Sequence, residues 1–231
     1  MKVVVTGASK GIGKAIACAF AREGASVAVC ARTAEELEQT RQELERIAPG
    51  REHLAVQADC SDKTQFQVFC EQVRNRYGIL DVLVNNVGLF REAELLEGPE
   101  ELLEEMLGLN LWPAYLGSRF FARGMKARQR GHIFNICSVA GLRAVPGAGA
   151  YTVSKHAMLG LSRALRLELK TFGVKVTSVI PGSTRTASWE DTPVDTGKFV
   201  TAADVASAVV NSWRLGPHST IEELLITPTE L

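Results

Sequence analysis

A tyrosine and a lysine lie four residues apart in the stretch YTVSKHAMLG, which begins at Tyr151. Residues at i and i+4 share one face of a helix, so a helix here would direct Tyr151 and Lys155 at the same object. A phenol has an ordinary pKa near 10, and an adjacent ammonium lowers it by roughly one to three units because it stabilises the phenolate. The pair is suited to proton donation, although such a spacing also arises by chance on a solvated surface.

Two further polar side chains could assist a proton transfer. The hydroxyl of Ser138 could donate a hydrogen bond to an oxygen that gains negative charge. Asn110 lies in the helix-like apolar segment LGLNLWPAYLG. Pro113 lacks an N–H and its ring crowds the carbonyl of Leu109, so we expect a kink beside Asn110. The alternative is that Asn110 lies near the kink by chance and has no role in the site.

The glycine-rich segment TGASKGIG directly follows a β-rich run at the start of the chain and opens a helix-like segment. Its glycines allow a tight turn, close approach of a pyrophosphate and close packing of the helix on the sheet. The helix N-terminus would offer free N–H groups to the anion. This position favours a dinucleotide site over a plain strand-to-helix turn. The residues expected to contact the cofactor here are Gly7, Ser9, Lys10, Gly11, Ile12 and Gly13.

The second β-rich run ends without a carboxylate, in VAVCART. An acidic residue there would select NAD, whereas a cation selects the 2′-phosphate of NADP. Arg32 at this end, together with Lys10, therefore predicts NADP(H), with solvated surface charges as the alternative. Asp59 closes the third run, where it could accept from the adenine amino group or serve only as a turn residue.

β-rich runs alternate with segments of helical periodicity along most of the chain. The runs cover residues 2–7, 26–31, 53–59, 80–86, 131–138, 174–182 and 222–227. Their apolar residues follow one another, as expected of parallel strands covered on both faces. Capping boxes at Thr33, Asp62 and Thr201 predict helix starts. The predicted fold class is α/β, a single Rossmann-type doubly wound parallel sheet with helices on both faces.

Composition excludes several classes of function. The 26 basic and 26 acidic side chains balance, which argues against nucleic acid or an anionic membrane as the main partner. Five scattered cysteines favour reduced core thiols over a disulfide or metal framework. A strand almost at the first residue leaves no room for a signal peptide, so we expect a cytoplasmic protein. We expect one dinucleotide-binding and catalytic domain over residues 1–231, with a substrate lid at about 183–200.

Five motifs occur in order: TGxxxGxG, NNVG ending at Gly88, NICS ending at Ser138, YxxxK and PG at Pro181. In this pattern the chain resembles the short-chain dehydrogenase/reductase family over nearly its whole length. The resemblance implies a nicotinamide cofactor and an active site of Asn110, Ser138, Tyr151 and Lys155. It also implies that Lys155 holds the nicotinamide ribose and that the asparagine anchors a proton-relaying water. Further expected cofactor residues are Asn85, Asn86, Gly88, Tyr151, Lys155, Pro181, Gly182, Thr184 and Thr186. For Asn85 and Asn86 the alternative is that their amides hold neighbouring strands.

Apolar candidates for the substrate pocket are Phe90, Val139, Val145 and Trp189. They favour a small-molecule carbonyl substrate, and hence an NADPH-dependent carbonyl reductase. Alternatives are a 3-oxoacyl-[acyl-carrier-protein] reductase and a non-catalytic NADP-binding protein. A carrier protein could dock on the basic run Arg119, Arg123, Lys126, Arg128 and Arg130, although cations near a helix C-terminus also complement its dipole. The family habit of pairing the helices that bear Asn110 and Tyr151 implies a homodimer or homotetramer.

Overall fold

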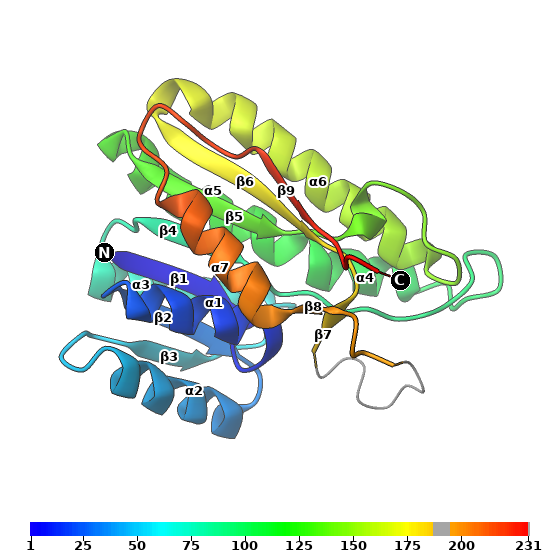
Figure 1. Ribbon diagram of the computed structural model, residues 1–231, viewed down its shortest axis with the longest axis horizontal. Coiled ribbons are helices and arrows are strands. Elements are labelled where there is room, and N and C mark those ends of the chain that lie inside the picture. Colours follow the sequence, from blue (N-terminus) through cyan, green and yellow to red (C-terminus); the bar gives the residue numbers. More distant parts are fainter. Residues whose placement is uncertain (187–194, 231) are drawn as a thin grey trace.

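The structure, a computed structural model, describes residues 1–186 and 195–230. Within these ranges a seven-stranded sheet has the strand order β3-β2-β1-β4-β5-β6-β9, and every neighbouring pair of its strands is parallel (Figure 1). The strands are β1 (Lys2–Thr6), β2 (Ser26–Ala31), β3 (Leu54–Gln57), β4 (Val82–Asn85), β5 (Gly131–Ile136), β6 (Val174–Pro181) and β9 (Glu223–Ile226). Each lies within one of the predicted runs, so the parallel sheet is confirmed.

Helices cover both faces of this sheet, as predicted. One face packs against α1 (Gly11–Arg22), α2 (Ala34–Ile47) and α7 (Ala202–Trp213), and Figure 1 shows α1 and α7 side by side. The other face packs against α3 (Lys63–Tyr77), α5 (Trp112–Arg128) and α6 (Gly149–Leu169). In β1, Val3 and Val5 face the first layer and Val4 the second. Both faces of a strand are thus buried, which explains the unbroken apolar runs.

The predicted helix caps are confirmed in part. Thr201 and Asp204 form the full capping box at the start of α7. Asp62 caps α3 by accepting from two backbone N–H groups, but Gln65 bonds the Asp62 side chain instead of its backbone. The box at Thr33 is wrong: Thr33 is the N-cap residue of α2, but its side chain makes no capping hydrogen bond, and Glu36 forms an exposed ion pair with Lys10.

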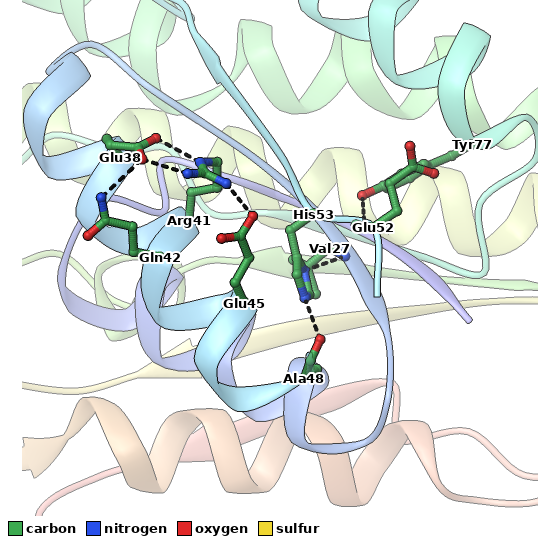
Figure 2. A network of polar contacts seen from close by, with 9 residues as sticks. All are labelled: Val27, Glu38, Arg41, Gln42, Glu45, Ala48, Glu52, His53 and Tyr77. Atoms are coloured by element: carbon green, nitrogen blue, oxygen red, sulfur yellow. Dashed lines mark hydrogen bonds and ion pairs between the residues drawn. The ribbon is translucent and has the colours of Figure 1, made fainter. Parts of the chain in front are cut away.

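Figure 2 shows the contacts that hold the connection between α2 and β3. His53 Nδ1 accepts from the Val27 N–H at 3.3 Å, and Nε2 lies 3.4 Å from the Ala48 carbonyl oxygen, so Nε2 carries the proton. Burial lowers the pKa of His53. The Tyr77 hydroxyl donates to the Glu52 carbonyl at 2.7 Å, which brings the end of α3 to the same connection. Side chains here complete the backbone bonding where the β2–β3 pairing begins.

His132 on β5 is a buried titratable side chain with a fixed tautomer. Its Nε2 lies 2.8 Å from Thr177 Oγ1, whose own proton goes to the Ile221 carbonyl at 2.6 Å. Nε2 therefore donates, and Nδ1 has no hydrogen-bond partner in the part of the chain that the structure describes. Burial, with a smaller contribution from Lys175, lowers the pKa of His132 to about 3.

We expect acid to destabilise the fold through His132. Between pH 6.5 and pH 3 the unfolded chain binds a proton that the folded chain excludes, so stability falls as the pH falls through this window. The unfolding free energy of the wild type should drop between about pH 7.5 and pH 5. In His132→Leu this drop should be smaller by about 2 kcal/mol. Urea denaturation of both proteins at the two pH values measures it. An equal pH dependence in the two proteins would contradict the assignment.

The predicted lid lies partly outside the described residues, and so does Trp189. Its two ends are joined as a small parallel sheet, in which β7 (Thr184–Arg185) pairs with β8 (Val200–Thr201). Among the described helices, none combines the length and the apolar character needed to cross a bilayer.

Candidate active site

Tyr151 and Lys155 lie one turn apart near the start of α6. Lys155 Nζ is 5.6 Å from the centre of the Tyr151 ring, and the lysine is 4% exposed. Within the described ranges its ammonium makes one hydrogen bond, to the Ile136 carbonyl at 3.3 Å. An ammonium has three donors and is costly to bury unpaired, so this position is suited to bind further acceptors.

The Tyr151 ring is partly buried between apolar neighbours. Phe90 meets it edge-on, with 5.0 Å between ring centres, and Phe90 itself is 46% exposed. Tyr151 also packs against a cluster that contains Leu102 and Met106. The proton-donor candidate therefore lies beside an exposed aromatic side chain, and the role of Phe90 in the substrate pocket stays a prediction.

The predicted kink beside Asn110 is a complete break between two helices. Helix α4 (Leu102–Asn110) ends at Asn110, Leu111 leaves helical geometry with φ −120°, and α5 begins at the next residue. Pro113 lies in the first turn of α5, where its missing N–H costs nothing. Asn110 is 0% exposed, and its Oδ1 accepts from the Leu89 N–H at 2.7 Å while its Nδ2 donates to the Leu89 carbonyl at 3.0 Å.

Gly88 is the point where these segments meet. A Cβ atom on Gly88 would lie 3.2 Å from Asn110 Oδ1 and 3.2 Å from Lys155 Nζ. The NNVG segment, the helix break and α6 are thus in mutual contact. A side chain at this position would separate Asn110 from Lys155, so the glycine keeps the two groups close.

Ser138 follows β5 and begins a short 3-10 helix, η1 (Val139–Gly141). Its Oγ accepts from the Ala140 N–H at 3.2 Å, which leaves its own proton free to be donated. Gly141 places η1 against α6, because a Cβ there would lie 2.8 Å from the Lys155 carbonyl oxygen. Ser138 therefore lies on a segment that packs directly on the helix of Tyr151 and Lys155.

The glycine turn lies where the strand order reverses between β1 and β4. Gly7 and Gly11 have φ of 64° and 59°, which only glycine adopts without strain. Asn86 Nδ2 donates to the carbonyls of Thr6 at 3.0 Å and Gly7 at 2.8 Å, and so joins the two strand ends. A Cβ on Gly13 would lie 2.4 Å from Asn86 Nδ2 and 2.5 Å from the Gly7 oxygen. The topological switch point is the usual dinucleotide crevice of such sheets.

The N-terminus of α1 has no side-chain cap. Lys10 is its N-cap residue, and the Lys10 side chain makes no capping hydrogen bond with the first backbone N–H groups of the helix. These groups and the helix dipole are suited to bind an anion. The residues present therefore fit the pyrophosphate of a dinucleotide. Val87 fills the space beside Gly7, since a Cβ on Gly7 would lie 3.1 Å from Val87 Cγ2.

Both cations predicted to bind a 2′-phosphate are exposed. Lys10 Nζ lies 3.7 Å from a Glu36 carboxylate oxygen, with the lysine side chain 65% exposed, so this ion pair is weak. Arg32 accepts from the Gln57 amide through its carbonyl at 2.9 Å. Asp59 Oδ1 accepts from the N–H and the hydroxyl of Ser61, so Asp59 makes the contacts of a turn residue. The adenine role of Asp59 and the phosphate roles of the cations stay predictions.

The segment after β6 returns to the glycine turn. Gly182 donates its N–H to the Ile226 carbonyl at 2.8 Å, and Thr184 Oγ1 donates to the Gly182 carbonyl at 2.9 Å. A Cβ on Gly11 would lie 3.4 Å from Thr186 Cγ2, so Thr186 lies over the predicted pyrophosphate turn.

Asn85 has a different environment from Asn86. It is 2% exposed, and its Nδ2 donates to Ser118 Oγ at 3.0 Å and Asn135 Oδ1 at 2.7 Å. The Asn135 amide in turn donates to Ser162 Oγ at 2.8 Å. Of the two roles considered for the asparagine pair, holding neighbouring strands is the one these contacts show.

Sequence reasoning missed a set of buried small polar residues, of which Ser154 is hydrogen-bonded to Asn110 and Tyr151. They are all 0% exposed, and they comprise Ser118, Asn135, Ser154 and Ser162. Serine and asparagine are common on surfaces, so their type carried no signal. Only the i+3 spacing from Tyr151 to Ser154 could have indicated a contact.

Two of the apolar candidates for the substrate pocket, Val139 and Val145, are half-buried. Val139 packs against a buried cluster that contains Cys137 and Met158.

Three cations of the basic run have partners within the chain: Arg119 with Tyr115, Lys126 with Phe172, and Arg128 with Asp81. These contacts favour the interpretation that the basic residues stabilise the protein's own structure over the interpretation that they dock a carrier protein.

Comparison with known proteins gives a consistent result. A model of the short chain dehydrogenase family matches residues 1–196. Farnesol dehydrogenase from Aedes aegypti is 35% identical over 232 residues, which cover 97% of this chain and 94% of that protein.

Solved structures with a similar fold contain related cofactors. An alcohol dehydrogenase from the archaeon Thermococcus sibiricus, complexed with 5-hydroxy-NADP, has a TM-score of 0.91 and 30% identity over 100% of this chain and 97% of its own. An actinorhodin polyketide ketoreductase with NADPH has a TM-score of 0.88 and 30% identity, over 97% and 95% of the two chains.

Proposed function

Because the chain belongs to the short chain dehydrogenase family, we propose that it is an NADPH-dependent reductase of a small ketone or aldehyde, in which Tyr151 is the proton donor. The observation that carries the proposal is the buried ammonium of Lys155 beside the Tyr151 ring, with one hydrogen-bond acceptor among the described residues. A charge buried in this way is expected where it has a chemical task. The whole chain would act as one binding and catalytic unit.

NADPH supplies a hydride when it is bound. The Tyr151 hydroxyl donates its proton to the carbonyl oxygen as that oxygen gains negative charge. Lys155 stabilises the phenolate that remains on Tyr151. Ser138, whose Oγ already accepts from the Ala140 N–H, directs its own proton at the same substrate oxygen and stabilises the developing charge. The backbone at the helix break beside Asn110 would hold the water that returns a proton through Lys155.

The residues that would hold the cofactor follow from the geometry above. The uncapped N-terminus of α1 and the open backbone of Gly7 and Gly11 would bind the pyrophosphate, with Thr186 covering it. Lys10 and Arg32 would bind the 2′-phosphate. The 5-hydroxy-NADP and NADPH bound to the two solved relatives support this choice of cofactor.

Reversing the charge at Arg32 should change the cofactor preference. In Arg32→Asp, kcat/KM for NADPH should fall by about 100-fold or more, because a charge-assisted hydrogen bond is replaced by repulsion, while NADH is affected little. The matched control is Lys170→Asp, a change of an exposed cation at the far end of α6. The ratio of kcat/KM values for the two cofactors is measured in all three proteins. A ratio that is the same in Arg32→Asp and the wild type would refute the phosphate role.

The experiment that tests the function is a panel of ketones, diketones, aldehydes and oxoacyl thioesters, followed by NADPH absorbance. Turnover that is lost in Tyr151→Phe would support the proposal, and a wild-type protein that reduces none of them would contradict it. A preference for oxoacyl thioesters would favour the second candidate, a 3-oxoacyl-[acyl-carrier-protein] reductase. The likeness to the polyketide ketoreductase favours that candidate, whereas the internal partners of the basic run argue against carrier docking.

A homodimer or homotetramer is also part of the proposal. Exposed apolar side chains on α5 and α6 support it, namely Trp112 at 42%, Val153 at 42% and Leu167 at 79% exposure. Pairing with another subunit would cover these side chains. A monomer mass in light scattering would contradict it.

A further inference from the structure

We propose that Ser154 is a positioning residue, which ties the helix break at Asn110 to the turn of α6 that carries Tyr151 and Lys155. The inference rests on the proposed function, because the residues that it positions are the proposed proton donor and its lysine. Ser154 is 0% exposed and lies on the buried side of α6, one residue before Lys155.

The direction of each hydrogen bond at Ser154 follows from its partners. Ser154 Oγ lies 2.7 Å from the Tyr151 carbonyl oxygen and 2.9 Å from Asn110 Nδ2. A carbonyl oxygen only accepts, so the single hydroxyl proton goes to Tyr151. The oxygen of Ser154 must then accept from the Asn110 amide. The serine thus joins two segments that are 44 residues apart in the chain.

The Asn110 amide can take only one orientation in this arrangement. Its Oδ1 accepts from the Leu89 N–H at 2.7 Å, and one Nδ2 hydrogen goes to the Leu89 carbonyl at 3.0 Å. A flipped amide would place acceptor against acceptor and donor against donor at Leu89. The second Nδ2 hydrogen goes to Ser154 Oγ at 2.9 Å, with the Met106 sulfur as a weaker acceptor at 3.8 Å, which completes the bonding of a buried amide.

This chain of bonds sets where α6 begins relative to the helix break. Asn110 Oδ1 and Lys155 Nζ both lie against Gly88, each 3.2 Å from the position of a Cβ there. If the bond to Ser154 is lost, the first turn of α6 can shift relative to Asn110 and Gly88. Displacements of about 1 Å at reacting groups reduce rates by as much as 100-fold, so proton transfer should suffer more than cofactor binding.

Ser162 provides a matched control on the same helix. It is also 0% exposed, its Oγ donates to the Met158 carbonyl at 2.9 Å, and it accepts from the Asn135 amide at 2.8 Å. The bonding is similar in kind, but Ser162 lies eight residues further along α6, and these hydrogen bonds go to Asn135 and Met158 instead of Asn110 and Tyr151. A purely structural effect of removing a buried serine hydroxyl should therefore be similar at the two sites.

The experiment compares Ser154→Ala with Ser162→Ala in kcat, in the Kd for NADPH and in Tm. Ser154→Ala should lower kcat by about 10-fold or more with the Kd changed less than about threefold, whereas Ser162→Ala should lower Tm comparably and keep kcat within about twofold. Equal values of kcat in the two variants overturn the inference. Should Ser154→Ala be too unstable to purify, Ser154→Cys keeps the volume with a weaker donor and should show a smaller loss of kcat. Wild-type kcat in that folded variant overturns the inference too.

Hydrogen exchange gives a second readout that does not need turnover. The Leu89 N–H donates to Asn110 Oδ1, so a loosened amide in Ser154→Ala should speed its exchange, and Ser162→Ala should not. Unchanged exchange in Ser154→Ala overturns the positioning role even if the protein reduces no carbonyl. A wild-type protein without turnover but with faster Leu89 exchange in Ser154→Ala would overturn only the proposed function.

Discussion

The substitution Tyr151→Phe should lower kcat by about 100- to 10,000-fold, the range that a general acid contributes, and leave the Kd for NADPH within about threefold. Only the hydroxyl is removed, and the phenyl ring keeps its edge-on contact with Phe90 and its position under Lys155. Tyr151 is partly exposed, so the stability of the fold should change little. Single-turnover absorbance of NADPH measures the rate, and fluorescence titration measures the Kd.

The matched control for this variant is Tyr115→Phe. Tyr115 lies on α5 and its hydroxyl accepts from Arg119 at 2.6 Å, so the variant also loses a tyrosine hydroxyl, but one outside the proposed site. Its kcat should stay within about twofold of the wild type. Undiminished reduction in Tyr151→Phe would remove Tyr151 as the proton donor. A comparable loss in both variants would show that the effect is not specific to Tyr151.

The second large effect is expected from a single methyl group at the glycine turn. In Gly13→Ala the new Cβ would lie 2.4 Å from Asn86 Nδ2 and 2.5 Å from the Gly7 oxygen, distances that real Cβ atoms do not adopt. The bond from Asn86 to the Gly7 carbonyl must break, or α1 must move away from β1. We expect unfolding free energy to fall by about 1–3 kcal/mol and NADPH affinity to fall by about 100-fold or more, because the phosphate turn is displaced.

Gly160→Ala is the control for this methyl group. Gly160 lies in the middle of α6, is exposed, and a Cβ there would meet nothing within 4 Å. Alanine should therefore raise stability by about 1 kcal/mol through helix propensity alone. Urea denaturation and NADPH titration of both variants measure the effects. Wild-type affinity for NADPH in Gly13→Ala would show that the turn does not hold the cofactor.

Much of the fold could be predicted from local patterns. Val3, Val4 and Val5 follow one another in β1 because the strand is buried on both faces, and this is the signature of a parallel sheet. The glycine spacing identified the turn after β1, because only glycine fits its backbone angles. Caps were less reliable. Thr33 has the expected sequence and is the N-cap residue of α2, but its side chain makes no capping bond.

Part of the candidate site could likewise be predicted from local patterns, and part could not. Tyr151 and Lys155 could be paired from sequence because a helix converts a spacing of four into a shared face. Pro113 likewise indicated the helix break beside Asn110, since the effect of a proline ring is local. Whether Asn85 would hold strands or touch the cofactor could not be decided, because that depends on which face of the sheet its side chain enters.

By itself, the sequence determined the parallel α/β architecture, the glycine turn and the residue types available for proton transfer. Only the tertiary structure decided that Lys155 is buried with one acceptor among the described residues, that Gly88 brings it beside Asn110, and that Ser154 joins the end of α4 to α6. The physical reason is that periodicity and backbone angles are properties of neighbouring residues. A buried hydrogen bond between residues 44 positions apart exists only once the chain has folded around it.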